Sequence, residues 1–126
     1  MAKRESMDIP GLVPHKNPIP HVSRTGNMIF SGGIIGYDAD GNIPETLEEQ
    51  TKCAFANMRK MVEGSGATLE DVAHVTVFLK TRANREPVNR EWLALFPDEK
   101  NMPARHAVKS DLDDPMQIQL EFIAVL

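Results

Sequence analysis

A strict alternation of side chains near the C-terminus constrains the fold more than any other feature of the sequence. Over residues 116–125 one alternating set is apolar throughout, and the other begins polar and ends apolar. The first set is Met116, Ile118, Leu120, Phe122 and Ala124, and the second is Gln117, Gln119, Glu121, Ile123 and Val125. Successive side chains of a strand point to opposite faces, so we expect helices to cover the first set. The apolar end of the second set predicts that another subunit covers part of the opposite face.

The most clearly defined helix is predicted after residue 46. Residues 46–49 match a capping box with Thr46 as the N-cap, and the helix is expected to end at Gly64 and Gly66. Apolar or small side chains recur at helical spacing and predict one buried face. They are Leu47, Thr51, Ala54, Phe55, Met58, Met61 and Val62.

A second helix is expected to begin near Pro87, which suits a first turn, and to end before Pro97. Its predicted apolar stripe is Val88, Trp92, Leu95 and Phe96. Strands are predicted over residues 21–24, 27–31, 72–80, 104–109 and 116–125. The resulting order, β-β-α-β-α-β-β, predicts an α+β fold in which two helices cover one face of a mixed sheet.

The N-terminal segment differs in composition from the rest of the chain. Residues 1–20 contain Pro10, Pro14, Pro18 and Pro20, which prevent a helix and favour an extended arm on the surface. No composition shift or repeat divides residues 21–126. We therefore expect residues 1–126 to form a single domain with a proline-rich arm over residues 1–20.

Charge and cysteine content limit the partners and the compartment. The net charge of −4 has the wrong sign for a protein that binds phosphate backbones, so no nucleic-acid partner is expected. Cys53 is the only cysteine of the sequence, which excludes an internal disulfide and is typical of a reducing compartment. No segment approaches the roughly 20 apolar residues of a membrane span. The expectation is a cytoplasmic protein without a membrane partner.

Arg105 is the strongest candidate for a functional residue. It follows Pro103 and Ala104 at the start of a predicted strand, and its planar guanidinium suits a carboxylate. The residue pattern alone leaves two alternatives, an interface salt bridge and a solvated arginine. If the last two strands paired in a suitable register, Arg105 would share a face with Gln119, at or near a subunit interface.

The other reactive side chains fit simpler roles. Cys53 has no patterned histidine partner and is interpreted as a buried small hydrophobe rather than a nucleophile. The segment Ser31-Gly32-Gly33 lacks the lysine of a phosphate-binding loop. An acidic segment occupies four ligand positions of a calcium loop but lacks its turn glycine, so we interpret it as a turn; it contains Asp38, Asp40, Asn42 and Glu49. The histidines are not spaced as metal ligands, so no metal is expected; they are His15, His21, His74 and His106.

Several short motifs, taken in order, resemble the RidA/YjgF family. They are Asn27-Met28-Ile29-Phe30-Ser31-Gly32-Gly33, Glu49-Gln50-Thr51, Leu69-Glu70-Asp71-Val72, Val75-Thr76-Val77-Phe78-Leu79, Val88-Asn89, Pro103-Ala104-Arg105 and Ile123-Ala124-Val125. The resemblance covers about residues 15–126, nearly the whole chain. Each motif is weak alone, and the specificity lies in their order and spacing.

The resemblance implies a chorismate-mutase-like fold and a homotrimer with ligand clefts between its subunits. It also implies hydrolysis of reactive 2-imino or 2-enamino acids, such as 2-aminoacrylate, to the 2-keto acid and ammonia, without a metal or organic cofactor. By the same resemblance Arg105 holds the substrate carboxylate, with help from the Gly33 backbone amide, and Asn89 lines the cleft.

Some positions depart from the family pattern. The family's cleft tyrosine aligns with Ile19, its serine with Gly32, and its frequent cysteine with Ala107. The glutamate that holds the attacking water aligns with Gln119, which can position water but cannot accept a proton near neutrality. Glu121, on the same strand face, is a candidate substitute.

Three functional hypotheses are consistent with these residues. The first is a deaminase with altered preference, because loss of the tyrosine and serine leaves a roomier, more apolar cleft and suggests a substrate larger than aminoacrylate. The second is a binding protein for small carboxylates such as 2-keto acids, without turnover. The third is the ribonuclease or translation-inhibitor role also attached to the family, which the net charge of −4 disfavours.

Overall fold

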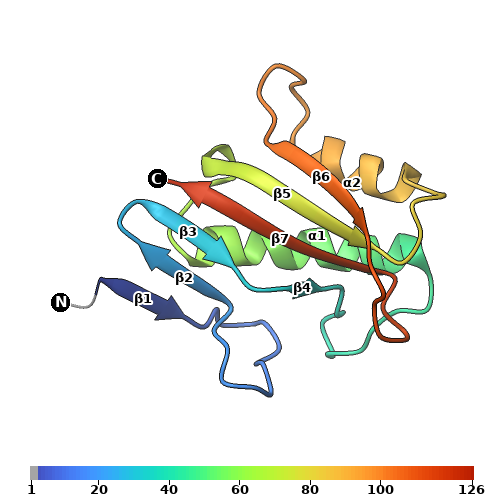
Figure 1. Cartoon of the computed structure of the whole chain (residues 1–126), viewed down its shortest axis with the longest axis horizontal. Coiled ribbons are helices and arrows are strands. Elements are labelled where there is room, and N and C mark those ends of the chain that lie inside the picture. The colour runs from blue at the N-terminus through green and yellow to red at the C-terminus, as the bar shows by residue number, and fades with distance from the viewer. Residues whose placement is uncertain (1–2) are drawn as a thin grey trace.

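The computed structural model describes residues 3–126 and shows a mixed sheet with both α-helices on one face (Figure 1). The elements in chain order are β1 (Arg4–Met7), β2 (Val22–Thr25), β3 (Met28–Ser31), β4 (Ile34–Ile35), α1 (Leu47–Gly64), the 3-10 helix η1 (Leu69–Asp71), β5 (Val72–Leu79), α2 (Glu86–Leu95), β6 (Ala104–Lys109) and β7 (Ile118–Val125). The seven-stranded sheet has the order β1-β2-β3-β7-β5-β6, and β4 also pairs with β7. Among these strands only β5 and β6 run parallel. The predicted α+β class is confirmed.

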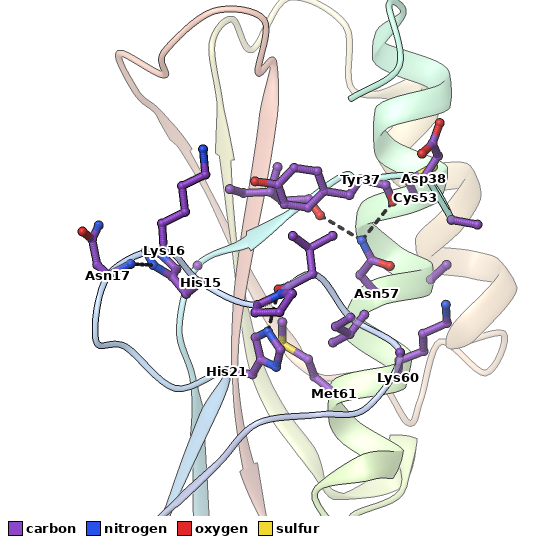
Figure 2. Close-up of a pocket in the computed structure, with 18 residues that line it drawn as sticks. His15, Lys16, Asn17, His21, Tyr37, Asp38, Cys53, Asn57, Lys60 and Met61 are labelled. Carbon is purple, nitrogen blue, oxygen red and sulfur yellow. Dashed lines mark hydrogen bonds between the residues drawn. The ribbon is translucent and has the colours of Figure 1, made fainter. Parts of the chain in front are cut away.

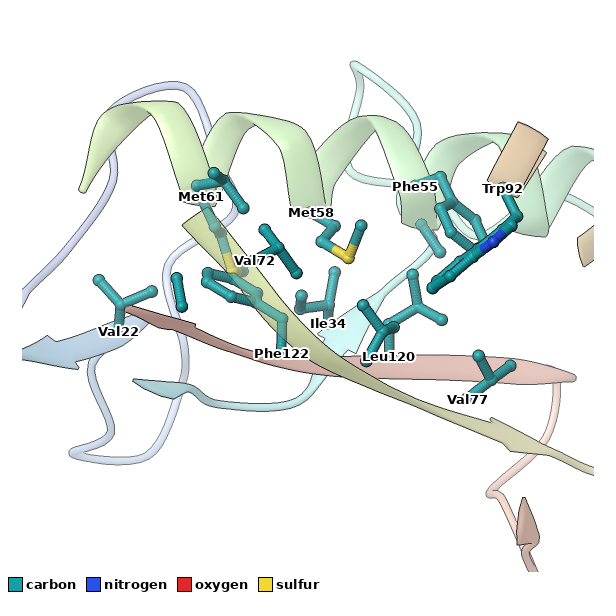
Figure 3. Packing of buried hydrophobic residues seen from close by; sticks show 14 of the residues in the cluster. Val22, Ile34, Phe55, Met58, Met61, Val72, Val77, Trp92, Leu120 and Phe122 are labelled. Atoms are coloured by element: carbon teal, nitrogen blue, oxygen red, sulfur yellow. The ribbon is translucent and has the colours of Figure 1, made fainter. Parts of the chain in front are cut away.

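Strand β7 lies in the middle of the sheet and carries much of the core. Ile118, Leu120, Phe122 and Ala124 are at most 1% exposed, so the face predicted to be covered by helices is confirmed. Figure 3 shows Leu120 and Phe122 pointing from the sheet toward α1. Burial of a side chain as large as Phe122 stabilises a fold by about 1.5–3 kcal/mol.

Helix α1 begins and ends where the sequence predicts. The Thr46 hydroxyl accepts a hydrogen bond from the Glu49 N–H at 3.2 Å, which satisfies one of the free donors of the first turn. At the other end Gly66 has a φ of 92°, a conformation that favours glycine. A Cβ at Gly64 would lie 2.7 Å from Ile9 Cγ2, so the helix end and the N-terminal arm pack closely.

The N-terminal arm is attached to the fold by a strand and by buried side chains, which the proline pattern did not predict. Residues 1–2 lie outside the described part, and Arg4–Met7 form β1, which pairs antiparallel with β2. Ile9 is 5% exposed and joins the core. The buried His21 holds the arm in place, because its Nδ1 accepts from the Ile9 N–H at 2.8 Å and its Nε2 lies 2.9 Å from the Val13 carbonyl oxygen. The predicted extended arm without a helix is thus seen, with most of its described residues exposed or partly exposed, but Ile9 anchors it in the core. Strand β4, like β1, was not predicted, because its two residues are too few to show an alternation of apolar and polar side chains.

The sheet face without helices is apolar at one end. Met28 pairs with Val125 and Phe30 with Ile123, so these side chains share that face. Met28, Phe30 and Val125 are exposed in the single chain, as the sequence pattern predicted. Within residues 3–126 no helix is both long and apolar enough to cross a membrane.

Candidate carboxylate-binding site

Arg105 is held on β6 by contacts with α2. Its register partner on β5 is Val75, which is fully buried, so Arg105 lies on the helix-covered face. Its Nη2 donates to the Asn89 Oδ1 at 2.7 Å. Its guanidinium carbon lies 5.1 Å from the centre of the Trp92 ring, within the range of a cation–π interaction. These two contacts fix the plane of the guanidinium.

The positive charge of Arg105 is not balanced inside the chain. Within residues 3–126 the ion pairs involve Arg59, Lys80 and Arg90, and none involves Arg105. Burial lowers the pKa of the Arg105 guanidinium from its ordinary value, and the nearby Arg85 lowers it further. The side chain still remains a cation at any physiological pH. A half-buried cation without a counter-ion attracts an anion to its unused N–H donors.

The structure corrects the predicted position of Gln119 relative to Arg105. Strand β5 lies between β6 and β7, so the two residues are not on paired strands. Gln119 pairs with Phe78, whereas Arg105 pairs with Val75, and these positions point to opposite faces. The shared-face prediction is wrong because it assumed that the last two strands are neighbours.

Gln119 lies instead with a second group of predicted residues. A Cβ at Gly33 would overlap the Gln119 Nε2 atom, so the Gln119 side chain packs directly against the Gly33 backbone. A Cβ at Gly32 would lie 4.0 Å from Ile19 Cγ2, and the Gly32 N–H donates to the His21 carbonyl oxygen at 2.9 Å. Among residues 3–126 we find no protein acceptor for the Gly33 N–H.

The predicted site residues thus form two separate groups. The Arg105 cluster contains Arg105, Asn89 and Ala107, and the Gln119 cluster contains Ile19, Gly32, Gly33 and Gln119. Ala107 follows Arg105 on β6 and packs against the core. Two strand spacings, about 10 Å, and three residues along the strands, about 10 Å more, separate Arg105 from Gln119. One subunit therefore does not bring both clusters to the same small ligand.

Two side chains near Arg105 were not identified as site residues from the sequence. Trp92 was assigned only to the core, and it is indeed 6% exposed, with its ring 4.8 Å from that of Phe96. Arg85 precedes α2 and adds a second cation near Arg105. The helical spacing of Arg85, Asn89 and Trp92 could have indicated a shared face near one helix end.

Cys53 departs from its predicted role. It is only partly buried and lies outside the core, on the wall of a 480 Å³ cavity beside Gly33. The prediction of a buried small hydrophobe is therefore wrong. Burial raises the pKa of the Cys53 thiol, and Asp38 and Glu49 raise it further. A thiol that stays protonated is a poor nucleophile.

The acidic segment at residues 38–42 is a hydrogen-bonded turn. Asp38 Oδ1 accepts from the N–H groups of Asp40 and Asn42, at 2.9 Å each, so this segment forms a turn as predicted. Across residues 3–126 no cluster of three or more His, Cys, Asp or Glu side chains could hold a metal ion.

The family is decided by comparison of the whole chain with known proteins. A family model with the description Endoribonuclease L-PSP matches residues 15–126. The chain belongs to this family, known as YjgF/RidA. The recognition made from the short motifs is therefore confirmed.

Relatives and solved structures agree with this assignment. A RutC family protein of Pyrococcus abyssi is 36% identical over 110 residues, which cover 85% of this chain and 85% of that protein. The 2-iminobutanoate/2-iminopropanoate deaminase of Escherichia coli K12 is 31% identical over 103 residues, 79% of this chain and 80% of the enzyme. The crystal structure of the E. coli YjgF gene product has a TM-score of 0.86 at 27% identity, with 96% and 98% of the two chains covered. The chain therefore shares the YjgF/RidA fold, and some of its relatives are imine deaminases.

Proposed function

We propose that this YjgF/RidA protein is a hydrolytic deaminase of reactive 2-imino or 2-enamino acids. The observation that carries the proposal is Arg105, a half-buried cation without a carboxylate partner among residues 3–126. It is held in a fixed orientation by Asn89 and Trp92. The name of the E. coli relative, 2-iminobutanoate/2-iminopropanoate deaminase, supports the same class of substrate.

The separation of the two clusters supports a site shared between subunits. We propose a homotrimer in which the Arg105 cluster of one subunit faces the Gln119 cluster of the next. The exposed apolar end of the helix-free face, which includes Phe30 and Val125, would be buried in that assembly. Mass determination in solution tests this point, and a monomer at assay concentration would contradict it.

In the proposed reaction the guanidinium of Arg105 and the Gly33 N–H bind the substrate carboxylate and place C2 of the imine near Gln119. The Gln119 carboxamide positions a water molecule, whose oxygen adds to C2 while the imine nitrogen takes up a proton. Collapse of the resulting carbinolamine breaks the C–N bond and releases ammonia and the 2-keto acid. Fixed positions alone can lower the barrier substantially when the substrate is intrinsically labile.

A trapping assay tests the activity. An amino-acid oxidase generates 2-imino acids in situ, and semicarbazide captures those that survive. We expect the protein to lower the captured fraction, Arg105→Ala to abolish the effect, and Arg59→Ala to retain it. Arg59 is a matched control because it is an exposed arginine on α1 that pairs with Glu63. Equal trapping with and without the wild-type protein would refute the proposal.

The second candidate function is a carboxylate-binding protein without turnover. Gln119 favours it, because a carboxamide at this position accepts no proton near neutrality. In that case a 2-keto acid binds to the wild-type protein but not to Arg105→Ala, while the trapping assay shows no hydrolysis by either.

A further inference from the structure

We propose that the cavity beside Gly33 receives the substrate side chain, and that the protein prefers 2-imino acids with a long apolar side chain over short ones such as 2-aminoacrylate. This inference rests on the proposed deaminase function and names the substrate class of the same site. It concerns a part of the molecule that none of the predicted Arg105-cluster residues reaches.

The cavity lies at the edge of the sheet, between the N-terminal arm and α1 (Figure 2). Its volume is 480 Å³, within the range of about 300–1,000 Å³ that is usual for small-molecule sites. The arm forms one wall through residues 11–17, and α1 forms the opposite wall with Cys53, Asn57 and Lys60 among its residues. A substrate as small as 2-aminoacrylate leaves most of this volume unused.

Gly33 connects the cavity to the proposed reaction site. Its backbone lines the cavity, and a Cβ at this position would meet the Gln119 Nε2 atom. Gln119 lies directly against it. A substrate whose carboxylate reaches the Gly33 N–H therefore lies next to the wall of the cavity. The Gly33 backbone is the one group that belongs to both the predicted site and the cavity wall.

The lining favours an apolar side chain. Val13 is 40% exposed, and together with Ile35, Tyr37 and Ala56 it presents apolar surface to the cavity. Removing apolar surface from water is favourable, so binding of an aliphatic or aromatic side chain is favoured there. Cys53 adds an uncharged group to this wall, because its thiol pKa is raised by burial.

Polar groups of the wall are already engaged or lie where they can reach solvent. The Asn57 amide donates to the Ile35 and Tyr37 carbonyl oxygens at 2.9 and 3.1 Å, so its donors are used. Lys60 is exposed, and its long side chain can keep the ammonium in water. An apolar group can therefore enter the cavity without removing the Lys60 charge from water.

The wall formed by the arm is fixed before any ligand binds. His21 is 9% exposed and links Ile9 and Val13 through its two ring nitrogens. A preformed wall lowers the entropic cost of binding. The arm is thus a structural part of the proposed specificity pocket.

Substrate preference in the trapping assay tests the inference. The imino acids derived from alanine, leucine and phenylalanine are compared, and the readout is the ratio of kcat/KM for the long substrates to that for the short one. We expect a ratio above one for the wild-type protein. Ala56→Phe, which fills the cavity from α1, should lower the ratio at least about tenfold, since a few methylene groups in an apolar pocket account for this much discrimination.

Ala94→Phe is the matched control. Ala94 is also an exposed alanine within a helix, and it does not line the cavity, so the ratio should stay at its wild-type value. Val13→Asp is a second, independent variant, because the exposed Val13 side chain can be replaced without opening the core. It should also lower the ratio, by placing a charge on the wall.

The outcomes distinguish the two proposals. If the wild-type protein hydrolyses imino acids but its ratio is one or lower, or if neither Ala56→Phe nor Val13→Asp changes the ratio, the cavity is not the side-chain pocket and the deaminase proposal stands. If the wild-type protein hydrolyses none of the substrates, the proposed function and this inference are both overturned.

Discussion

Replacement of Arg105 gives the sharpest test of the proposed carboxylate site. In the structure one edge of the guanidinium is engaged by Asn89 at 2.7 Å, and its face lies 5.1 Å from the centre of the Trp92 ring. The remaining N–H donors are available to a ligand. We therefore expect Arg105→Ala to remove charge-assisted hydrogen bonds to the carboxylate without collapse of the surrounding helix and strand.

The loss of these hydrogen bonds sets the expected loss of affinity. A hydrogen bond to a charged group contributes about 1.5–3 kcal/mol, so Arg105→Ala should weaken binding of a 2-keto acid about 10- to 150-fold. Arg105→Lys keeps the charge but loses the planar fork, and we expect it to lose about 1 kcal/mol, or roughly fivefold. The affinity for the 2-keto acid should therefore fall in the order wild type, Arg105→Lys, Arg105→Ala, because both the charge and the planar geometry of the guanidinium contribute to binding.

Calorimetry with a 2-keto acid is the appropriate assay, because the product of the proposed reaction binds without turning over. Arg59→Ala serves as the control and should bind like the wild-type protein, since an exposed i,i+4 pair with Glu63 contributes only about 0.3–0.5 kcal/mol to stability. Thermal unfolding should confirm that each variant is folded. Binding by Arg105→Ala within twofold of the wild-type protein would refute the assignment of Arg105 as the carboxylate clamp.

Three further predictions concern the neighbouring groups. Gln119→Glu should raise kcat at least about tenfold in the trapping assay, because general-base catalysis typically contributes 10²–10⁴-fold; no gain would show that Gln119 does not limit the reaction. Alkylation of Cys53 by iodoacetamide should be slower than that of free cysteine at pH 8 and should still be rising at pH 9, because a raised thiol pKa lowers the thiolate fraction; a rate equal to that of free cysteine would contradict the burial seen here. His21→Ala should lower the free energy of unfolding by about 1–3 kcal/mol, since the buried Ile9 N–H loses its acceptor, whereas His15→Ala, at an exposed position, should have little effect in the same denaturant titration.

Periodic elements could be predicted from the sequence because their hydrophobic patterns are long. The ten alternating residues at 116–125 and the helical stripe after Thr46 each report directly on which side chains are buried, and the structure confirms both. The short strands β1 and β4 could not be predicted in this way. Arg4–Met7 is mostly charged or polar and becomes a strand only because β2 offers an edge, and two residues of β4 carry no period at all.

The arrangement of the site could be predicted only in part, because strand neighbours are a property of the whole sheet. Insertion of β5 between β6 and β7 separates Arg105 from Gln119, and the registers of both strands with β5 place the two residues on opposite faces. No local pattern indicates this order. Trp92 was recognised as apolar, but its second role beneath Arg105 depends on how α2 packs on the sheet. The cavity beside Gly33 likewise arises from segments far apart in the sequence.

Three of the four departures from the family pattern lie on one side of the proposed site. Ile19, Gly32 and Gln119 belong to the Gln119 cluster, next to Gly33 and the 480 Å³ cavity, and the fourth, Ala107, lies two residues after Arg105 on β6. Arg105 and Asn89, which would hold the carboxylate common to every 2-imino acid, keep the residues that the family resemblance implies and contact each other directly. On the proposed function, the carboxylate shared by all 2-imino acids would meet Arg105 and Asn89, and the variable side chain would meet the cluster that holds most of the departures. Divergence arranged in this way would alter which side chain is accepted and how fast water is activated, while carboxylate binding would be retained.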